Sequence, residues 1–428
     1  MHATRSARRR VTELSAPPAD LLVAGFDLRA LPDGFYDDPF PTYHALRQAD
    51  PVHRCPDGSI FLTRYDDVVA VYQDHQRFAS DKRLEFAPKF GDSPLYEHHT
   101  TSVVFRDPPD HTRIRRLFAP AFTPRALAAL EPRIEALVDD LLARAAARGG
   151  MEVVDDFAAA VPVQLIGDML GIPADERGPL RAWSLAILGA LAPVTGPERL
   201  AAGNRAVEEF KEYLRRLIAA RRRRPGTDPG EILSALIAAE DAGDRLTEVE
   251  LLHQCIFLLN AGHETTTNLI ANAVLTLLEH PDAAARLRAE PGLIGTAVEE
   301  FLRYQSPNQL GNRRVDADAV LGGVALPPDT LITLCIGAAN RDPAQFREPD
   351  RVDLARTPNR HLAFITGIHA CAGMWLARME ARVAIGRLVA RFPVMRLAGP
   401  PVRGRRARFR TLVSLRVEVE GPAPRGGR

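Results

Sequence analysis

The sequence predicts a mostly α-helical protein with a small β portion. Segments with the helical period fill the middle of the chain, and short segments rich in β-branched residues flank them. Hydrophobic residues make up 46% of the 428 positions, which is enough to bury a large core. No repeat or linker divides the chain, so we expect one domain over residues 21–428 after a tail formed by residues 1–20.

The N-terminal part is expected to alternate short helices and strands. The patterns predict a helix from Pro41, strands at residues 51–55 and 59–63, and a helix over residues 66–77. Residues 81–106 are expected to be irregular, because prolines and a glycine interrupt every period there.

The rest of the chain is expected to change from helices to strands. Residues 109–338 should be mostly helical, with short strands and loops beginning after Pro307. The C-terminal part is predicted to contain strands at 315–326 and 330–336, a polar stretch at 340–370, a helix at 372–391 and a hairpin at 407–419.

Charge and cysteine content exclude several classes of protein. The net charge of +1 gives no electrostatic reason to expect nucleic acid or an anionic membrane as a partner. The apolar runs are too short for a membrane span. Four scattered cysteines without metal-finger or redox spacing indicate a reducing compartment, so we expect a cytoplasmic protein.

One cysteine, Cys371, lies between two glycines directly before a predicted helix. Gly367 permits a tight turn, and Gly373 permits close approach of the backbone. A helix N-terminus favours the thiolate form, and a soft thiolate is a good ligand for haem iron. The alternative is a buried inert thiol, which is the state expected of the other three cysteines.

A long apolar helix is predicted over residues 248–279, opened by a capping box of Thr247 and Glu250. At ~1.5 Å per residue it spans ~48 Å, enough to cross the molecule. Glu264 and Thr265 lie in its buried middle, where carboxylates are rare. A zinc motif is excluded because position 267 is threonine, so the alternative to a functional pair is a polar bend without a role.

Two weaker motifs lie elsewhere in the chain. Glu300 and Arg303 have the spacing of an ion pair on a helix surface, which is a common feature. His111 and Arg115 share one helix face and offer the fixed cationic donors that a carboxylate-bearing cofactor needs. A basic surface helix is the alternative for this second pair.

Taken together, these motifs resemble the cytochrome P-450 family. The family's cysteine loop, F-G-x-G-x-H/R-x-C-x-G, matches residues 364–373 except at Ile365, where the family has glycine. The family's A/G-G-x-D/E-T-T/S motif matches residues 261–266. Its E-x-x-R pair, which Arg356 would complete, follows in the family's order, and the resemblance covers nearly the whole chain after residue 36.

The resemblance implies a roughly triangular domain with haem b (iron protoporphyrin IX) buried between the helices at residues 248–279 and 372–391. Cys371 would be the axial ligand of the haem iron, and Glu264 and Thr265 would deliver protons for the reaction of O₂. The resemblance assigns the propionate-holding role to His111, Arg115, Arg313 and His369, and the role of fixing the cysteine loop to Glu300, Arg303 and Arg356.

The implied activity is that of a haem-thiolate monooxygenase, an oxidoreductase that hydroxylates or oxidatively demethylates a small organic substrate with O₂. Its two electrons must come from outside, because the sequence has no flavin or iron–sulfur motif. A ferredoxin with an NAD(P)H-dependent ferredoxin reductase is the implied partner. The alternatives are an H₂O₂-using peroxygenase, which the Glu264–Thr265 pair disfavours, a non-catalytic haem-binding sensor, and a haem-free helical protein.

The resemblance also places a substrate pocket. Segments 81–106 and 182–192 would contribute to it, and residues 409–413 would close it. Arg83 and Arg410, with Asn308 and Gln309, could orient a polar or acidic substrate. The positions expected to line the pocket are Leu258, Ala261, Asn308, Gln309 and Leu310.

Ile365 is the one clear departure from the family pattern. Isoleucine is β-branched and strained at positive φ, so we expect a negative φ at this position.

Overall fold

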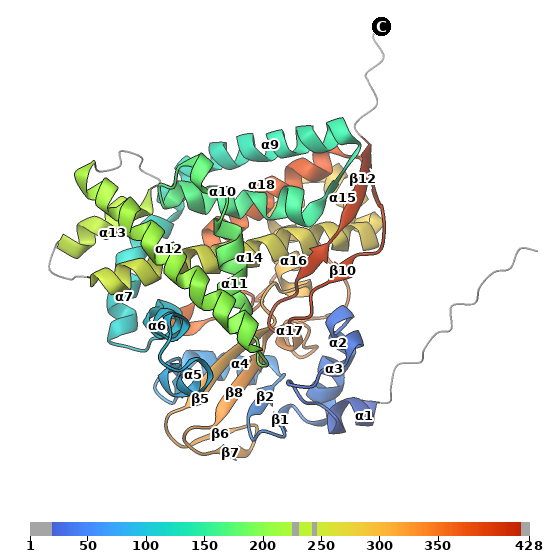
Figure 1. Ribbon diagram of the computed structural model, residues 1–428. Helices are drawn as coiled ribbons and strands as arrows, with labels where there is room; N and C mark the ends of the chain where they lie inside the picture. The colour runs from blue at the N-terminus through green and yellow to red at the C-terminus, as the bar shows by residue number, and fades with distance from the viewer. Residues whose placement is uncertain (1–18, 225–230, 242–245, 421–428) are drawn as a thin grey trace, which may run out of the picture.

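Helices make up most of the structure, and one of them, α14 (Glu248–Glu279), runs through its centre (Figure 1). The computed structural model describes residues 19–224, 231–241 and 246–420. The predicted class, mostly α with a small β portion, is confirmed. The predicted tail, residues 1–20, lies outside the described residues except for Ala19 and Asp20, which begin α1.

The α-helices besides α14 are α1 (Ala19–Ala24), α2 (Asp33–Asp37), α3 (Phe40–Ala49), α4 (Tyr65–Gln73), α5 (Arg83–Phe90), α6 (Pro94–Thr101), α7 (Asp110–Phe118), α8 (Pro124–Leu127), α9 (Glu131–Arg148), α10 (Ala160–Met169), α11 (Leu180–Gly189), α12 (Pro197–Arg223), α13 (Ile232–Asp241), α15 (Pro281–Ala289), α16 (Ile294–Tyr304), α17 (Ile336–Ala339) and α18 (Met374–Arg391).

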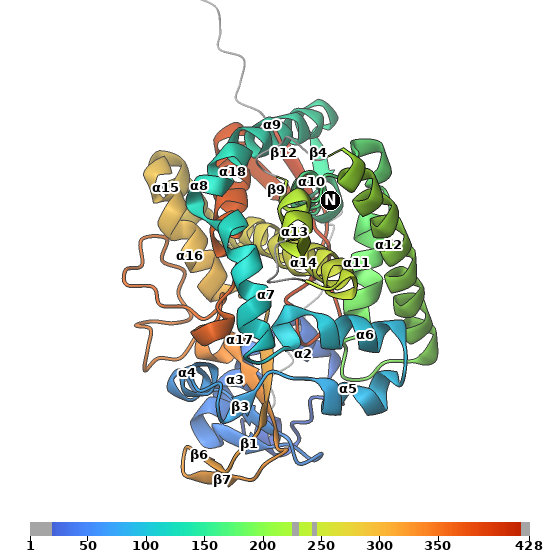
Figure 2. The same cartoon turned by 90° about the vertical axis from the view of Figure 1, so that its left-hand side faces the viewer.

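The central helix α14 begins and ends where the sequence predicts. The Thr247 hydroxyl accepts a hydrogen bond from the Glu250 backbone N–H at 3.1 Å, and the Glu250 carboxylate accepts one from the Thr247 N–H at 2.9 Å. At the other end, Pro281 follows the last turn and starts α15. The helix packs against α10, α11, α12 and α18, and Figure 2 shows α12 and α13 beside the end that faces the viewer.

The largest sheet lies at the bottom of Figure 1 and has five strands in the order β1-β2-β8-β5-β3. β2 and β8 are parallel, and the other neighbours are antiparallel. Its strands are β1 (Val52–Arg54), β2 (Ile60–Leu62), β8 (Leu331–Cys335), β5 (Leu310–Val315) and β3 (Phe78–Ala79).

Three smaller sheets complete the β portion. One has the order β4-β12-β9, and β10 pairs with β11 and β6 with β7. Their strands are β4 (Gly150–Glu152), β6 (Ala319–Leu321), β7 (Val324–Leu326), β9 (Val394–Leu397), β10 (Val402–Arg403), β11 (Leu412–Ser414) and β12 (Arg416–Glu420).

The prediction that residues 81–106 are irregular is wrong, because they contain α5 and α6. Gly91 and Pro94 lie at the ends of these helices, and Pro88 is accommodated inside α5. Gly91 ends α5 at a φ of 59°, and the Ser93 hydroxyl accepts a hydrogen bond from the Tyr96 N–H as the N-cap of α6. Pro94 occupies the first turn of α6, where its missing N–H has no intrahelical partner to lose.

Two strand predictions are also wrong. Residues 315–326 do not form one strand, because Gly322 and Gly323 have positive φ angles of 53° and 83° and turn the chain between β6 and β7. Residues 407–419 do not form a hairpin, since β11 pairs with β10 while β12 pairs with β4 and β9. The partners of β12 come from distant parts of the chain, which a local pattern does not reveal.

Candidate functional site

A cavity of about 340 Å³ lies between α14 and α18. Thr265 and Ala261 of α14 line one wall, and Cys371 and the start of α18 line another. Most of its remaining lining is apolar, and part of this apolar surface comes from α10, α11 and the segment that follows α6. The cysteine loop and the polar middle of the long helix, which lie far apart in the sequence, therefore face one common space.

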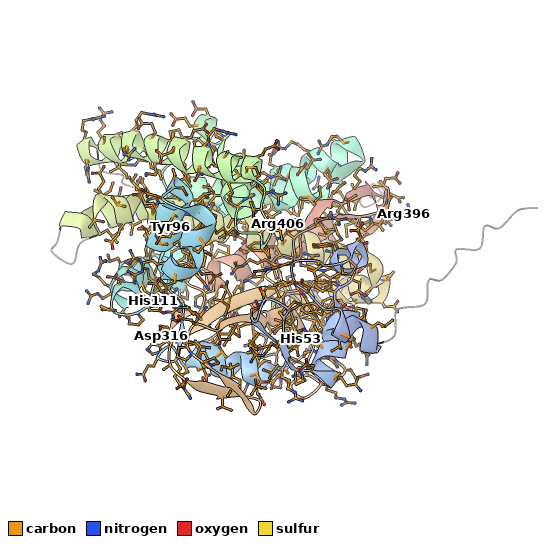
Figure 3. The ribbon with its side chains drawn as sticks, turned by 60° about the horizontal axis from the view of Figure 1, so that its bottom comes forward. His53, Tyr96, His111, Asp316, Arg396 and Arg406 are labelled. Carbon is orange, nitrogen blue, oxygen red and sulfur yellow. The ribbon has the colours of Figure 1, made fainter. Side chains whose placement is uncertain are left out.

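The middle of α14 holds two polar groups with different surroundings. The Thr265 hydroxyl lines the cavity and donates a hydrogen bond to the Ala261 carbonyl at 2.7 Å, four residues earlier. Glu264 is only 3% exposed. Arg406, which is labelled in Figure 3 and lies in the loop between β10 and β11, donates to its carboxylate. The second oxygen of Glu264, Oε2, has no hydrogen-bond partner among the described residues.

The loop before α18 directs Cys371 into the cavity. The Cys371 N–H donates to the Phe364 carbonyl at 3.0 Å, which closes the loop on itself. Gly367 has a φ of 76°, and a Cβ at this position would lie 2.1 Å from the Tyr72 carbonyl oxygen, so only glycine fits. The tight turn that the sequence motif predicts at Gly367 is therefore present.

Burial raises the pKa of the Cys371 thiol, while the Gly373 backbone N–H, Arg115 and Arg378 act in the opposite direction. The helix N-terminus therefore does not by itself make this thiol a thiolate. A positively charged partner such as a metal ion would do so. The remaining cysteines, Cys55, Cys255 and Cys335, are buried free thiols, as expected.

The expectation of a negative φ at Ile365 is wrong, because its φ is +51°. A tight turn imposes this conformation: the Ile365 N–H donates to the Leu362 carbonyl at 2.8 Å, just before the loop that carries Cys371. The side chain packs against the cluster that contains Tyr72 and Leu362. This apolar contact offsets the backbone strain of about 1–3 kcal/mol that such a conformation costs.

Basic side chains meet beside the cysteine loop. The rings of His111 on α7 and His369 lie 4.1 Å apart, and Arg115 donates to the Ala370 carbonyl at 2.5 Å. All three line the cavity. Arg313 of β5 is buried but does not line the cavity. Its guanidinium carbon lies 5.0 Å from the centre of the Tyr72 ring, and its positive charge helps to lower the pKa of His369.

Burial lowers the pKa of His111 to about 4, with a smaller contribution from Arg115, and it lowers the pKa of His369 to about 2. His111 Nδ1 and His369 Nε2 are buried without a hydrogen-bond partner in the described part of the chain. These residues fit a haem. The thiol can bind the iron, and the unpaired ring nitrogens and the guanidinium groups can bind its propionates.

The predicted triad forms a buried ion-paired cluster that holds the segment before the cysteine loop. Arg303 makes two hydrogen bonds of 2.8 and 2.7 Å to the Glu300 carboxylate, and both side chains are fully buried. Arg356 donates to the same carboxylate at 3.1 Å. Arg303 also donates to the carbonyls of Asn340 and Pro349, so the cluster anchors the polar stretch at residues 340–370.

The predicted substrate positions are only partly correct. Leu258, Ala261 and Asn308 line the cavity, but Gln309 and Leu310 do not. The Gln309 amide donates to the Ser306 carbonyl, and Leu310 packs in the core cluster around Tyr43. Pairing of β5 with β8 places Leu310 opposite Cys335 in that core, and the Gln309 carbonyl accepts a hydrogen bond from the Gly337 N–H.

The two arginines expected to orient a substrate are also placed elsewhere. Arg83 is 61% exposed at its side chain and pairs with Asp81. Arg410 donates to the carbonyls of Tyr36 and Asp37 and to Gln305.

Several cavity residues were missed by the sequence analysis. His98, His99 and Asn260 form a polar patch on one wall, where His98 Nε2 lies 3.2 Å from Asn260 Nδ2. Arg408 enters from the loop between β10 and β11, beside Phe409, which belongs to the segment expected to close the pocket. The signal that could have found them is five arginines within residues 403–410 of an otherwise apolar C-terminal sheet, and two adjacent histidines in the segment expected to contribute to the pocket.

Within residues 19–224, 231–241 and 246–420, no helix combines the length and hydropathy needed to cross a membrane. The same residues contain no cluster of three or more His, Cys, Asp or Glu side chains arranged to hold a metal ion.

Comparisons with known proteins agree with this geometry. Residues 197–402 match the family model described as Cytochrome P450. The chain is 42% identical to Cytochrome P450 107B1 of Saccharopolyspora erythraea over 88% of this chain and 93% of that protein. It is 41% identical to the Vitamin D(3) 25-hydroxylase of Pseudonocardia autotrophica over 85% of this chain and 89% of that protein.

The structure is also similar to that of P450BioI in complex with an acyl carrier protein that carries hexadec-9Z-enoic acid. The TM-score is 0.86 at 36% identity, and the match covers 90% of this chain and all of that one.

Proposed function

Since the chain belongs to the cytochrome P-450 family and is a monooxygenase, we propose that it binds haem b through Cys371 and hydroxylates or oxidatively demethylates an apolar small organic molecule. The observation that carries the proposal is that Cys371, in the loop before α18, and Thr265, in α14, line the same cavity. When bound, the haem supplies the activation of O₂ and the transfer of one oxygen atom to the substrate.

The residues around Cys371 would fix the cofactor. The cysteine sulfur would bind the iron, and the N–H of Gly373 supports its anionic form. His111, Arg115 and His369 line the cavity near the cysteine loop and would donate to the propionates, with Arg313 adding positive charge behind them.

Thr265 and Glu264 would move protons into the cavity. The Thr265 hydroxyl donates its hydrogen to the Ala261 carbonyl, so its oxygen can accept a hydrogen bond from a proton donor on the cavity side and hold that donor in place. Glu264 has one carboxylate oxygen held by Arg406 and the other unpaired. Rotation of the Glu264 side chain away from Arg406 would turn its carboxylate toward Thr265, so that Glu264 could deliver a proton to the cavity.

We assign electron supply to a ferredoxin and an NAD(P)H-dependent ferredoxin reductase in the cytoplasm. The assignment is supported by the lack of a flavin or iron–sulfur motif in the sequence. All four cysteines are free thiols, which suits a reducing compartment. The substrate class is supported by the apolar lining of the cavity and by the named substrate of one relative, vitamin D(3).

The test is a turnover assay under isotopically labelled O₂ with NAD(P)H, a ferredoxin reductase, a ferredoxin and a panel of apolar substrates. The proposal predicts a product that carries one labelled oxygen atom and requires both NAD(P)H and the ferredoxin. A protein that forms product only from added H₂O₂ would be a peroxygenase. A protein that binds haem and ligands but never forms product would be a sensor or carrier.

A further inference from the structure

Arg408 presents a guanidinium group to the cavity without a matching acid. It lies in the loop between β10 and β11, is partly buried, and lines the cavity beside Phe409. Its hydrogen bond to Asn312 Oδ1 is long, at 3.4 Å. Among the described residues, no carboxylate lies within ion-pair distance of it, in contrast to its neighbour Arg406, which pairs with Glu264.

The acid that acts most strongly on Arg408, Glu85, is already engaged. Lys82 is buried and donates to the Glu85 carboxylate at 2.5 Å. The other charged groups that affect Arg408 include Arg313 and Arg406, which are cations and oppose its charge. This end of the cavity therefore has more positive than negative charge.

A guanidinium that faces a largely apolar cavity without an anionic partner is stabilised by a ligand of opposite charge. Burial lowers the pKa of Arg408, which agrees with a guanidinium that lacks compensation. Burial also lowers the pKa of Lys89, close enough to Arg408 to interact with it, to about 8. The Lys89 ammonium group donates to the Ala192 carbonyl and does not line the cavity. Arg408 is therefore the cation whose N–H groups can donate to a ligand in the cavity.

Most of the remaining cavity lining is apolar, although His99 lies close enough to Arg408 for the two charges to interact. Val103, Leu188, Leu258 and Phe409 contribute aliphatic and aromatic surface to the cavity. One guanidinium at the edge of such a surface matches a molecule with an apolar body and a single anionic end. A carboxylate fits best, because its two oxygens match the two parallel N–H groups of arginine.

We propose that Arg408 is a specificity-determining residue that binds the carboxylate of an apolar carboxylic acid substrate. The inference rests on the proposed monooxygenase function and names the substrate class for the same cavity. A carboxylate at Arg408 would fix one end of the substrate and present its apolar chain toward Thr265 and Cys371.

A haem propionate is the other possible source of a carboxylate. Arg115, His111 and His369 already line the cavity beside Cys371 with donors for the propionates. The experiment therefore has to separate the two sources by measuring haem content and ligand preference on the same variants.

The test is calorimetric titration of the haem-loaded protein with dodecanoic acid and with its methyl ester, which has the same chain without the charge. The parent protein should bind the acid about tenfold or more tightly than the ester, the contribution of one charge-assisted hydrogen-bond pair. Arg408→Gln should lose this preference while its haem content and its affinity for the ester stay unchanged. Arg408→Lys should retain part of the preference, and the exposed control Arg83→Gln should retain all of it.

Two results would overturn the inference. In one, the parent protein binds acid and ester equally. In the other, Arg408→Gln loses haem but keeps its preference for the acid, which would assign the guanidinium to a propionate. Because the titration needs no turnover, a protein that prefers the acid but forms no oxygenated product would contradict the proposed function and leave the Arg408 site intact.

Discussion

Arg406 donates a hydrogen bond to the carboxylate of Glu264, although 142 residues separate them in the sequence. Arg406 also donates to the Leu188 carbonyl at the end of α11, at 3.2 Å. One guanidinium thus joins the central helix α14, α11 and the C-terminal loop, and it neutralises an acid that would otherwise be buried with an unpaired charge.

The Arg406–Glu264 pair is expected to contribute strongly to stability. Arg406→Leu would leave the buried carboxylate uncompensated and should lower the free energy of unfolding by about 3–5 kcal/mol. Its neighbour Arg405 pairs with Asp33 on the surface, where the two side chains are 63% and 78% exposed. Because solvent screens this exposed pair, Arg405→Leu should change the free energy of unfolding far less than Arg406→Leu. Melting curves that show equal effects for the two variants would contradict this account.

Thr265 is expected to couple electron use to product formation. Thr265→Ala removes the hydroxyl from the cavity wall but keeps a good helix former, so the protein should still bind haem and substrate. The amount of H₂O₂ released per NAD(P)H consumed should rise severalfold, and Thr265→Ser should restore coupling. Thr267 makes the same type of bond, to the His263 carbonyl at 2.8 Å, but does not line the cavity. Uncoupling by Thr267→Ala to the same extent would remove the special role of Thr265.

His263 on α14 is expected to make the fold sensitive to acid. It is 1% exposed, and burial, with a smaller effect of Arg181, lowers its pKa from 6.5 to about 4. Between pH 6.5 and pH 4, His263 binds a proton in the unfolded chain but stays neutral in the folded protein. The free energy of unfolding therefore falls as the pH is lowered through this range. His263→Gln lacks this titration. From pH 7 to pH 5 the parent should lose about 2 kcal/mol more of its unfolding free energy than the variant does. A difference between the two proteins that is independent of pH would contradict the prediction.

The positive φ of Ile365 predicts an unusual order of stability among its variants. Alanine at this position keeps most of the backbone strain and loses the packing, whereas glycine loses the packing but relieves the strain. Ile365→Gly should therefore be more stable than Ile365→Ala by about 1 kcal/mol. Ile385, a buried residue within α18, is the control, since glycine there should be less stable than alanine by about 1 kcal/mol. The same order at both positions would show that the strain at Ile365 has no energetic effect.

Local chemistry made part of this fold predictable. The capping box at Thr247 and the proline at 281 define both ends of α14, because each acts on the backbone within a few residues. Glu300 and Arg303 lie one helical turn apart, so their contact follows from the helix alone. Gly367 was identifiable because a tight turn requires a residue without Cβ.

Contacts between distant segments could not be predicted in the same way. Nothing near Glu264 in the sequence indicates Arg406, and nothing near Asn308 indicates that Arg408 enters the same cavity. The error at Ile365 has a similar cause. Its φ is set by the turn that brings Cys371 back toward α14, and a propensity for negative φ cannot outweigh the packing of the whole loop.

Cys371 as the haem ligand is the central claim, and the absorption spectrum of the reduced, CO-bound protein tests it most directly. The parent protein should show the red-shifted Soret band of a thiolate-ligated haem, and Cys55→Ala, Cys255→Ala and Cys335→Ala should keep it. Cys371→Ala should lose this band, and Cys371→His should replace it with the band of a histidine-ligated haem. Persistence of the thiolate band in either Cys371 variant, or its loss on replacing another cysteine, would contradict the account.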